Sequence, residues 1–237
     1  MKYFIDRWRL YKKHQHDLEP LTPDTPIECI YDIINTLDKK DTIQRLQKFK
    51  RWPVSRTLVN GKSFQEKIKE GNFSPGTFGA EYKKWLVDDN FMDLVLIALG
   101  SQKTKSKLLD AYIKNSVITH DLAHFLNGYG TDSIGEVNVL SFDLAREWRA
   151  SWSTIVGFLG WFSLKRHGLR AFITYVRWCT EAYLRGRRAV DFMYTDWEQM
   201  FDLPLDEVKR KVGIYDKPKL WNDPKLERYK SVLQNQG

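Results

Sequence analysis

The sequence predicts an all-α fold, a single-domain bundle of several helices. Apolar residues recur at every third or fourth position through most of the chain, which is the spacing of one helix face. Capping residues, prolines at first helical positions and glycines divide these stretches into segments of helix length. The alternation of apolar and polar residues that is typical of half-buried strands is scarce. We therefore expect helices packed on helices around one core.

The composition supports one domain over residues 1–237. A hydrophobic share of 42% and an aromatic share of 14% are enough for a packed core in a chain of 237 residues. No internal repeat, low-complexity tract or proline-rich linker separates two differently composed parts. We expect the core at about residues 22–215, between a polar N-terminal extension and a charged C-terminal tail.

The first helices are predicted from their capping signals. Thr25 as N-cap, Pro26 and Glu28 open a helix whose apolar residues recur over 27–37. The next two expected helices are shorter. A capping box at 63–66 opens the first of them and Gly71 ends it, while Thr77 caps the second. An apolar segment over 91–99 follows, with Gly100 as its stop.

The second half of the chain is predicted to be almost continuously helical. A helix from about residue 105 to Asn127 carries the histidines discussed below, and His167 is expected to cap a helix C-terminus. The other expected helices are 134–149, 151–165, 169–185, a short one around Trp197, and 205–212 with Gly213 as C-cap. The apolar run over 151–164 is about fourteen residues long, whereas a membrane span needs about 20, so we expect it to be buried or to line a groove.

Charge and cysteine usage limit the classes of partner and compartment. The 38 Lys and Arg outnumber the 30 Asp and Glu, and the basic residues are densest between Lys165 and Arg188, which fits an anionic surface or a solvated helix face. No nucleic-acid-binding signature is present, so we expect no such partner. Cys29 and Cys179 fit reduced thiols, and the first residues lack a secretory or transit pattern, so we expect an intracellular protein.

The segment with the clearest chemistry begins at His120. Residues four apart in a helix lie on the same face, so the side chains of His120 and His124 can point to a common centre. Asp121 lies three residues before His124, and the glycines after residue 127 supply a turn that lets Glu136 fold back. Two imidazoles and two carboxylates suit zinc, ferrous iron or manganese, and magnesium less well. The residues therefore predict a divalent metal site.

The same residues also have structural explanations. The two histidines could belong to a polar network in the core, and Asp121 could orient an imidazole without touching a metal. Glu136 could close a capping box with Ser133 at the start of a helix. A second histidine pair, His14 and His16, lies in a polar stretch without further ligands, and we interpret it as surface.

The metal motif resembles the signature of the coenzyme-Q-four family, the metal-binding proteins of ubiquinone biosynthesis. The shared pattern is His-Asp-x-x-His, eleven residues and then Glu. The resemblance covers roughly residues 22–215, and its further segments are 75–82, 128–129, 135–136, 182–189, 196–198 and 204–214. The polar N-terminus, the charged tail and the aromatic region 148–162 depart from the family pattern.

This resemblance implies an all-helical, membrane-associated protein that binds a polyprenyl lipid. It also implies a divalent metal ion, zinc by resemblance with iron or magnesium as alternatives, held by the four catalytic residues His120, Asp121, His124 and Glu136. The reaction it implies replaces the ring carboxylate of a prenylated hydroxybenzoate by a hydroxyl group. Because zinc has no redox chemistry, that step would need iron at the same ligands or dioxygen reacting directly with the ring.

The resemblance also directs attention to a lipid site and to partners. An apolar groove would take the prenyl chain, since each buried methylene contributes about 0.8 kcal/mol, and arginines would receive an anionic head group. The residues expected there are Trp152, Phe158 and Trp161 for the chain and Arg185, Arg187 and Arg188 for the head group. We expect a homodimer that is attached peripherally to a membrane and associates with other quinone-biosynthesis proteins. The membrane face would be cytoplasmic in a bacterium and the matrix side of the mitochondrial inner membrane in a eukaryote.

Two other functions are compatible with the residues. A non-enzymatic prenyl-lipid carrier or scaffold would use the metal only to tie helices together, and it would bind lipid without turnover. A metallohydrolase is less favoured, because His-Asp-x-x-His places a shorter acid than the His-Glu-x-x-His of zinc proteases, where the glutamate is the general base.

Overall fold

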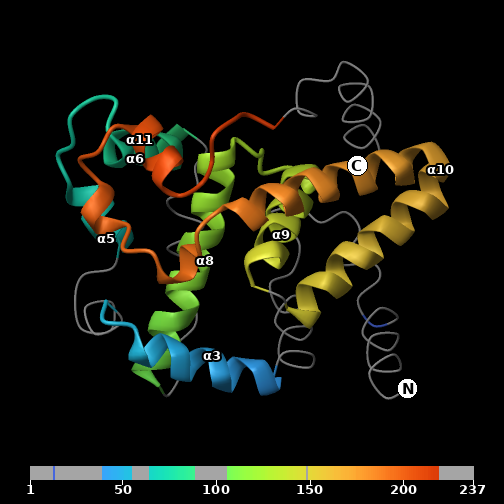
Figure 1. The fold of residues 1–237 in the computed structure, drawn as a ribbon, viewed down its shortest axis with the longest axis horizontal. Coiled ribbons are helices and arrows are strands. Elements are labelled where there is room, and N and C mark those ends of the chain that lie inside the picture. Colours follow the sequence, from blue (N-terminus) through green and yellow to red (C-terminus); the bar gives the residue numbers. More distant parts are fainter. Residues whose placement is uncertain (1–12, 14–38, 55–63, 89–105, 148, 219–237) are drawn as a thin grey trace. The chain divides into compact units, whose positions relative to one another are not determined.

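The computed structural model describes residue 13 and residues 39–54, 64–88, 106–147 and 149–218 (Figure 1). Regular structure in these residues is helical, and their one β-type pairing is an isolated bridge between Thr77 and Pro204. The predicted all-α class is therefore confirmed. The helix expected from Thr25 and the apolar segment over 91–99 lie outside the described residues.

The chain forms two compact units. The first comprises Met1–Lys40, Asn127–Ala189 and Asp216–Gly237, and the second comprises Asp41–Leu126 and Val190–Tyr215. A single domain over the whole chain stays a prediction. Each unit has a core of its own, and the residues with the clearest chemistry lie on the helices at the centre of the chain.

The second unit contains most of α3 (Lys39–Arg51), α5 (Phe64–Glu70), α6 (Phe78–Asp88), most of α8 (Lys107–Asn127) and α11 (Leu205–Lys211). It also holds the 3-10 turns Phe192–Tyr194 and Glu198–Met200. The expected helix signals are confirmed at Thr77, whose hydroxyl accepts from the Ala80 amide at 3.4 Å, and at Gly213, which has a φ of +83° just after α11. Helix α3 lies in a polar stretch where the sequence predicted no element.

Aromatic side chains form the core of this unit. The Phe78 ring is fully buried and contacts the rings of Tyr82, Phe125, Trp197 and Phe201 at centroid distances of 5.9 to 6.2 Å. These rings come from α6, α8 and the segment after the first 3-10 turn, so one cluster fixes three parts of the chain. Burial of each large ring contributes about 1.5 to 3 kcal/mol, which makes the cluster a rigid support for α8.

The first unit is built on α9 (Ser133–Arg146) and α10 (Ala150–Arg188), which cross closely. A Cβ atom on Gly186 would lie 2.1 Å from the carbonyl oxygen of Phe142, so only glycine permits this approach. Helix α10 breaks at Gly168, which has φ 79° and ψ −177°. Figure 1 shows α10 as two straight arms joined at a sharp bend. The two helices predicted over 151–165 and 169–185 are these arms, and His167 lies directly before the break.

None of the helices in the described ranges is both long and apolar enough to cross a membrane.

Candidate metal centre

The two histidines of the motif lie one turn apart on α8. Their Nε2 atoms are 3.3 Å apart, and their ring centroids are 4.9 Å apart. The side chain of His124 is only 2% exposed, whereas His120 is half-buried. Leu122 and Leu126 on the same helix are fully buried, so the packing of α8 fixes the direction of both imidazoles.

The chain turns after α8 and presents Glu136 in the first turn of α9. The turn begins at Gly128, which has a φ of +70°. A Cβ atom on Gly135 would lie 1.6 Å from the carbonyl oxygen of Gly130, so the turn is tight enough to require glycine at position 135. The N-cap of α9 is Asp132, whose carboxylate accepts from the amides of Ile134 at 3.1 Å and Gly135 at 2.8 Å.

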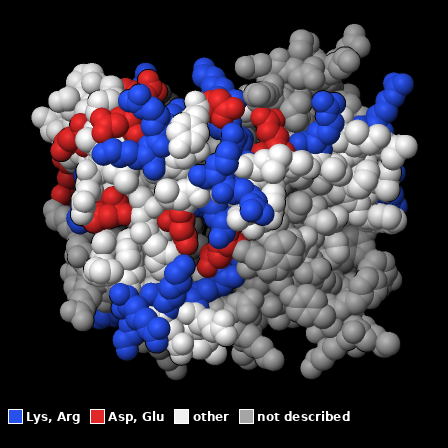
Figure 2. Space-filling view, viewed as in Figure 1, with Lys and Arg blue, Asp and Glu red and all other residues white. Residues whose placement is uncertain are grey.

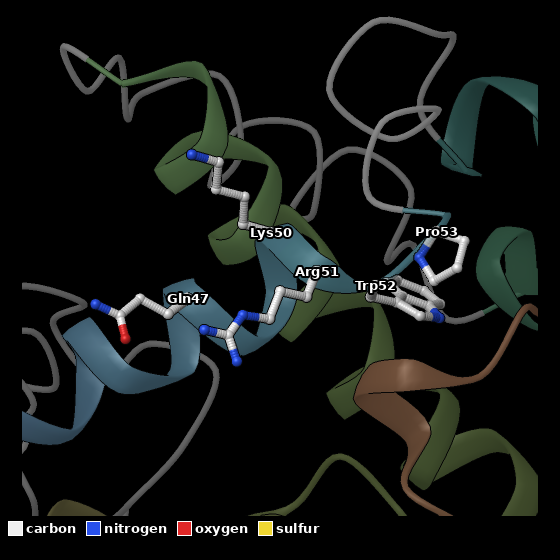
Figure 3. Close-up of a pocket in the computed structure, with 5 residues that line it drawn as sticks. All are labelled: Gln47, Lys50, Arg51, Trp52 and Pro53. Atoms are coloured by element: carbon white, nitrogen blue, oxygen red, sulfur yellow. The ribbon is translucent and has the colours of Figure 1, made fainter.

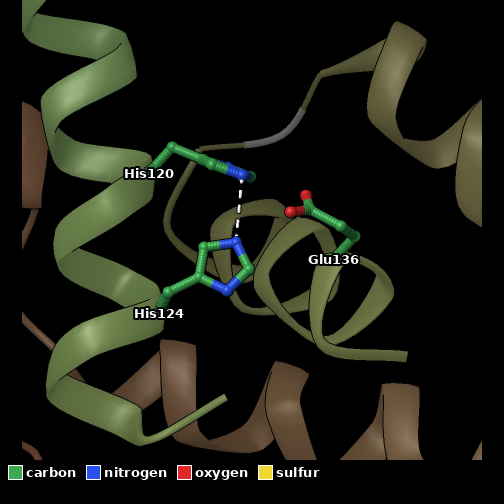
Figure 4. Close-up of side chains that lie close together, drawn as sticks. All are labelled: His120, His124 and Glu136. Atoms are coloured by element: carbon green, nitrogen blue, oxygen red, sulfur yellow. Dashed lines mark hydrogen bonds between the residues drawn. The ribbon is translucent and has the colours of Figure 1, made fainter. Parts of the chain in front are cut away.

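This capping decides between the two interpretations of Glu136. The expected alternative was a capping box in which Ser133 is the N-cap and Glu136 occupies the third helical position. Asp132 takes the N-cap instead, so Glu136 falls one position further along and is not at the capping-box position. Figure 4 shows its carboxylate directed towards the two imidazoles.

Three of the four predicted ligands come together. His120, His124 and Glu136 each offer one ligand atom, and these atoms all lie within 4.8 Å of one another (Figure 4). Asp121 does not belong to this cluster. The cluster contains two nitrogen donors and one oxygen donor, which come from three of the four side chains that the sequence predicted around a divalent ion.

The donor geometry fits a metal ion. Zinc binds imidazole nitrogen at about 2.0 to 2.1 Å, so two nitrogens at a tetrahedral angle are about 3.4 Å apart. The observed separation of 3.3 Å between the two Nε2 atoms agrees with this value. Three protein donors would leave an open coordination position, and two histidines with one carboxylate also match the facial donor set of non-haem ferrous iron.

Asp121 is buried beside Tyr82 in the second unit. The aspartate is 6% exposed and the tyrosine is fully buried. Burial raises the pKa of Tyr82 well above its usual value, and the negative charge of Asp121 raises it further. Tyr82 was not predicted from the sequence, because only the packing of α6 on α8 brings a residue so far upstream to the motif. Asp121 as a metal ligand stays a prediction, and so does the alternative that it orients one of the imidazoles.

The residues expected to contact a prenyl chain have different environments. Trp152 is 9% exposed and packs in a cluster with Leu140, Leu144 and Ile155. Phe158 is partly buried against the same cluster, whereas Trp161 is 53% exposed. Trp152 thus contributes to the core between α9 and α10, and Trp161 is presented to the solvent. Their predicted role in lipid binding stays a prediction.

The three arginines expected at a lipid head group also differ. Arg185 is 3% exposed, and its guanidinium donates to the side-chain oxygen of Asn127 at 3.1 Å and to Asp216 at 3.1 and 2.7 Å. It therefore holds the segment at Asp216 against α10. Arg187 and Arg188 are exposed, and the Arg188 side chain lies 3.9 Å from the Asp216 carboxylate.

A cavity of about 800 Å³ lies at the C-terminal end of α3 (Figure 3). It is open to solvent, and the residues that line it are Gln47, Lys50, Arg51, Trp52 and Pro53. None of these residues was predicted to belong to a site. Trp52 is anchored by its ring contacts with Phe49 and Tyr194, so the cavity wall is fixed by the core of the second unit.

The helical fold and the two-histidine, one-carboxylate cluster together define an all-α protein with a candidate divalent metal centre. Residues 28–218 match the family model described as Coenzyme Q (ubiquinone) biosynthesis protein Coq4, and the chain belongs to that family. The resemblance inferred from the motif is thereby confirmed. A role in coenzyme Q biosynthesis follows from this membership.

A solved structure supports the fold. A candidate ubiquinone biosynthesis protein of Nostoc punctiforme PCC 73102 is similar to this chain with a TM-score of 0.62 and 15% sequence identity. The similarity covers 91% of this chain and 98% of that one. No protein with a curated description matches the sequence.

Proposed function

We propose that this protein holds one divalent metal ion with His120, His124 and Glu136 and acts on a prenylated hydroxybenzoate. The reaction replaces the ring carboxylate by a hydroxyl group, and dioxygen is the two-electron oxidant. Each turnover consumes one dioxygen and one water and forms the hydroxylated ring, one carbon dioxide and one hydrogen peroxide. The observation that carries the proposal is the convergence of three ligand atoms within 4.8 Å on a chain of the coenzyme Q biosynthesis family.

The side chains have separate tasks in this proposal. Both imidazoles must be deprotonated at the nitrogen that faces the centre, and the carboxylate of Glu136 offsets part of the positive charge of the ion. Asp121, beside them on α8, either completes the ligand set or orients an imidazole. Burial of His124 keeps water from one side of the centre.

The metal supplies the electrophilic chemistry when it is bound. A divalent ion polarises the carboxylate and phenolate oxygens of the ring, and ferrous iron can in addition carry the oxidation. The family resemblance favours zinc and the redox requirement favours iron. The identity of the metal is therefore determined by measuring which ion the purified protein holds and which ion supports turnover.

The lipid part of the proposal concerns the first unit. The prenyl chain would lie along the apolar residues of α10, and Arg187 or Arg188 would meet an anionic head group, since both are exposed. We propose peripheral attachment to a membrane, because a substrate with a long prenyl chain resides there. A homodimer and association with other quinone-biosynthesis proteins belong to the same proposal.

Aerobic turnover tests this function. Purified protein is incubated with a prenylated 4-hydroxybenzoate that carries a labelled carboxylate, and released carbon dioxide is counted against the hydroxylated product. We expect one carbon dioxide per product, and we expect Glu136→Gln to reduce turnover by at least about 100-fold. The matched control is Asp206→Asn, an acid-to-amide change at an exposed position of α11.

The same assay distinguishes an enzyme from a non-enzymatic lipid carrier. Protein that retains metal and co-purifies with prenyl lipid but releases no carbon dioxide under any metal loading would support a carrier or scaffold and would contradict the enzymatic proposal.

A further inference from the structure

Large apolar side chains are unusually exposed on α10. In the described part of the chain, Trp161 is 53% exposed, Leu169 65%, Ile173 50% and Val176 43%. These four residues lie on the two arms that meet at the Gly168 break. We call residues 161–177 the α10 elbow. Contiguous apolar surface on a soluble protein marks a site of interaction more often than a single exposed leucine does.

The exposed apolar residues of the second arm form one stripe. At 100° per residue, Leu169, Ile173, Val176 and Leu184 fall within about 80° of arc on the helix surface. Leu184 is 55% exposed, so the stripe continues beyond the elbow for two further turns. The opposite side of the same arm is used for the core, where Trp178 and Ala182 are buried. The arm is thus amphipathic with an exposed apolar face.

The charged side chains of the α10 elbow are all basic. Lys165, Arg166, Arg170 and Arg177 are all exposed, and the sequence contains no Asp or Glu from residue 148 to residue 180. The whole chain has 30 acidic residues among 237, about one in eight, so a stretch of 33 residues without any is a local separation of basic from acidic charge. Over α10, at the right of Figure 2, blue side chains border white surface.

We propose that the α10 elbow is the surface that docks on an anionic phospholipid bilayer. Apolar residues flanked by arginine and lysine are the composition of helices that lie in the membrane interface, with the apolar side chains among the acyl chains and the cations at the phosphates. Leu169 directly follows the break, and Trp161 lies about two helical turns before it on the other arm, so the elbow would enter the interface as the tip of a helical hairpin. The inference rests on the proposed membrane attachment and is independent of the metal centre.

Vesicle flotation with the full-length chain tests the surface. The probe is vesicles of phosphatidylcholine with about one third phosphatidylglycerol, compared with phosphatidylcholine alone. We expect Leu169→Ser with Ile173→Ser to weaken binding to the anionic vesicles at least about tenfold. The matched control is Ile43→Ser with Val87→Ser, two apolar residues that are 59% and 58% exposed on other helices, and it should bind like the wild type.

A second pair of variants tests the charges without altering the apolar face. Arg170→Gln with Arg177→Gln should weaken binding to anionic vesicles by about fivefold per arginine at low salt, and the difference should shrink in about 0.5 M salt. Lys50→Gln with Arg51→Gln, two exposed cations of α3, is the control. All four variants change exposed residues, and circular dichroism confirms that each is folded.

The outcomes distinguish the elbow surface from membrane attachment in general and from the metal centre. Equal vesicle binding by the elbow variants and the wild type would overturn the assignment of the elbow while membrane attachment stands. No vesicle binding by the wild type would overturn both the attachment and the elbow, and metal content would still report on the centre. A change in molar mass by light scattering, with vesicle binding unaltered, would instead show that the stripe faces a second copy of the chain.

Discussion

At the scale of single residues, Gly186 controls how closely α9 and α10 approach. Its missing side chain leaves room for the backbone carbonyl of Phe142, which cannot move away as a flexible side chain could. We predict that Gly186→Ala lowers the free energy of unfolding by about 1 to 3 kcal/mol, because the added methyl overpacks the crossing. Urea denaturation measures this change.

The control for this substitution lies in the same helix. Gly157 is helical and exposed, and a Cβ atom there would meet nothing within 4 Å. Gly157→Ala should therefore raise stability by about 0.5 to 1 kcal/mol. Equal effects of the two substitutions would show that helix propensity, and not the crossing, controls position 186.

Cys179 gives a residue-scale prediction about pH. Burial raises the pKa of its thiol from 9.0 to about 11, against smaller opposing effects of hydrogen bonds with Ser141 and Tyr175. At pH 8 the thiolate fraction of the folded protein is then about 100-fold lower than that of an unfolded chain. In a Cys29→Ser background, we predict that Cys179 reacts with a disulfide reagent about 100-fold more slowly when folded than in urea.

The sign of the linked stability effect follows from the same shift. Between pH 9 and pH 11 the unfolded thiol loses its proton while the folded thiol keeps it, so the unfolded state binds fewer protons. The contribution of Cys179 to stability is complete below pH 9 and is lost as the pH rises towards 11. If Cys179 reacted with the disulfide reagent as fast in the folded protein as in urea, its thiol would not be buried with a raised pKa.

Residue-level prediction from sequence succeeded where the signal is local. His120, His124 and Glu136 lie within one helix, one turn and the next helix, so their spacing alone indicated a common centre. The capping alternative for Glu136 could not be removed from the sequence, because Asp132 and Ser133 are both good N-caps. Tyr82 lies far from the motif in sequence. Its contact with the motif depends on tertiary packing, so no local sequence pattern predicts it.

At the scale of elements, the break in α10 depends on Gly168. Its φ of 79° and ψ of −177° belong to a region that is almost restricted to glycine, although a Cβ atom there would meet nothing within 4 Å. We predict that Gly168→Ala costs about 1 to 3 kcal/mol of stability through backbone strain alone. Thermal unfolding against Gly157→Ala as the control measures it, and an unchanged melting temperature would contradict the strained backbone.

Sequence patterns predicted where most helices begin and end, but not which helices and segments pack against one another. The capping threonine at Thr77 and the glycine stops at Gly71 and Gly213 marked the ends of α5, α6 and α11 correctly. Helix α3 was missed because Ile43, Leu46 and Phe49 are its main apolar residues among many charged ones. The role of Arg185 was predicted from its charge, and its burial against Asn127 and Asp216 depends on a return of the chain that no local pattern encodes.

At the scale of the whole molecule, metal binding at the proposed centre is coupled to folding. Ligands that bind the folded chain and not the unfolded one stabilise it in proportion to the logarithm of their concentration. We predict that zinc or ferrous iron raises the melting temperature of metal-free wild type and leaves that of His124→Ala unchanged. Calorimetry with and without metal measures both, and an equal rise in the two proteins would place the bound ion elsewhere.

The most direct test of the metal centre is metal content by mass spectrometry on protein purified without chelators. The comparison is wild type with His124→Ala and Glu136→Ala, and with His167→Ala as a histidine control at the α10 break. We predict about one zinc or iron per chain in the wild type and in His167→Ala, and almost none in the other two variants. A well-folded wild type that holds no metal even after reconstitution, or His124→Ala and Glu136→Ala variants that keep the metal, would contradict a metal centre at these residues.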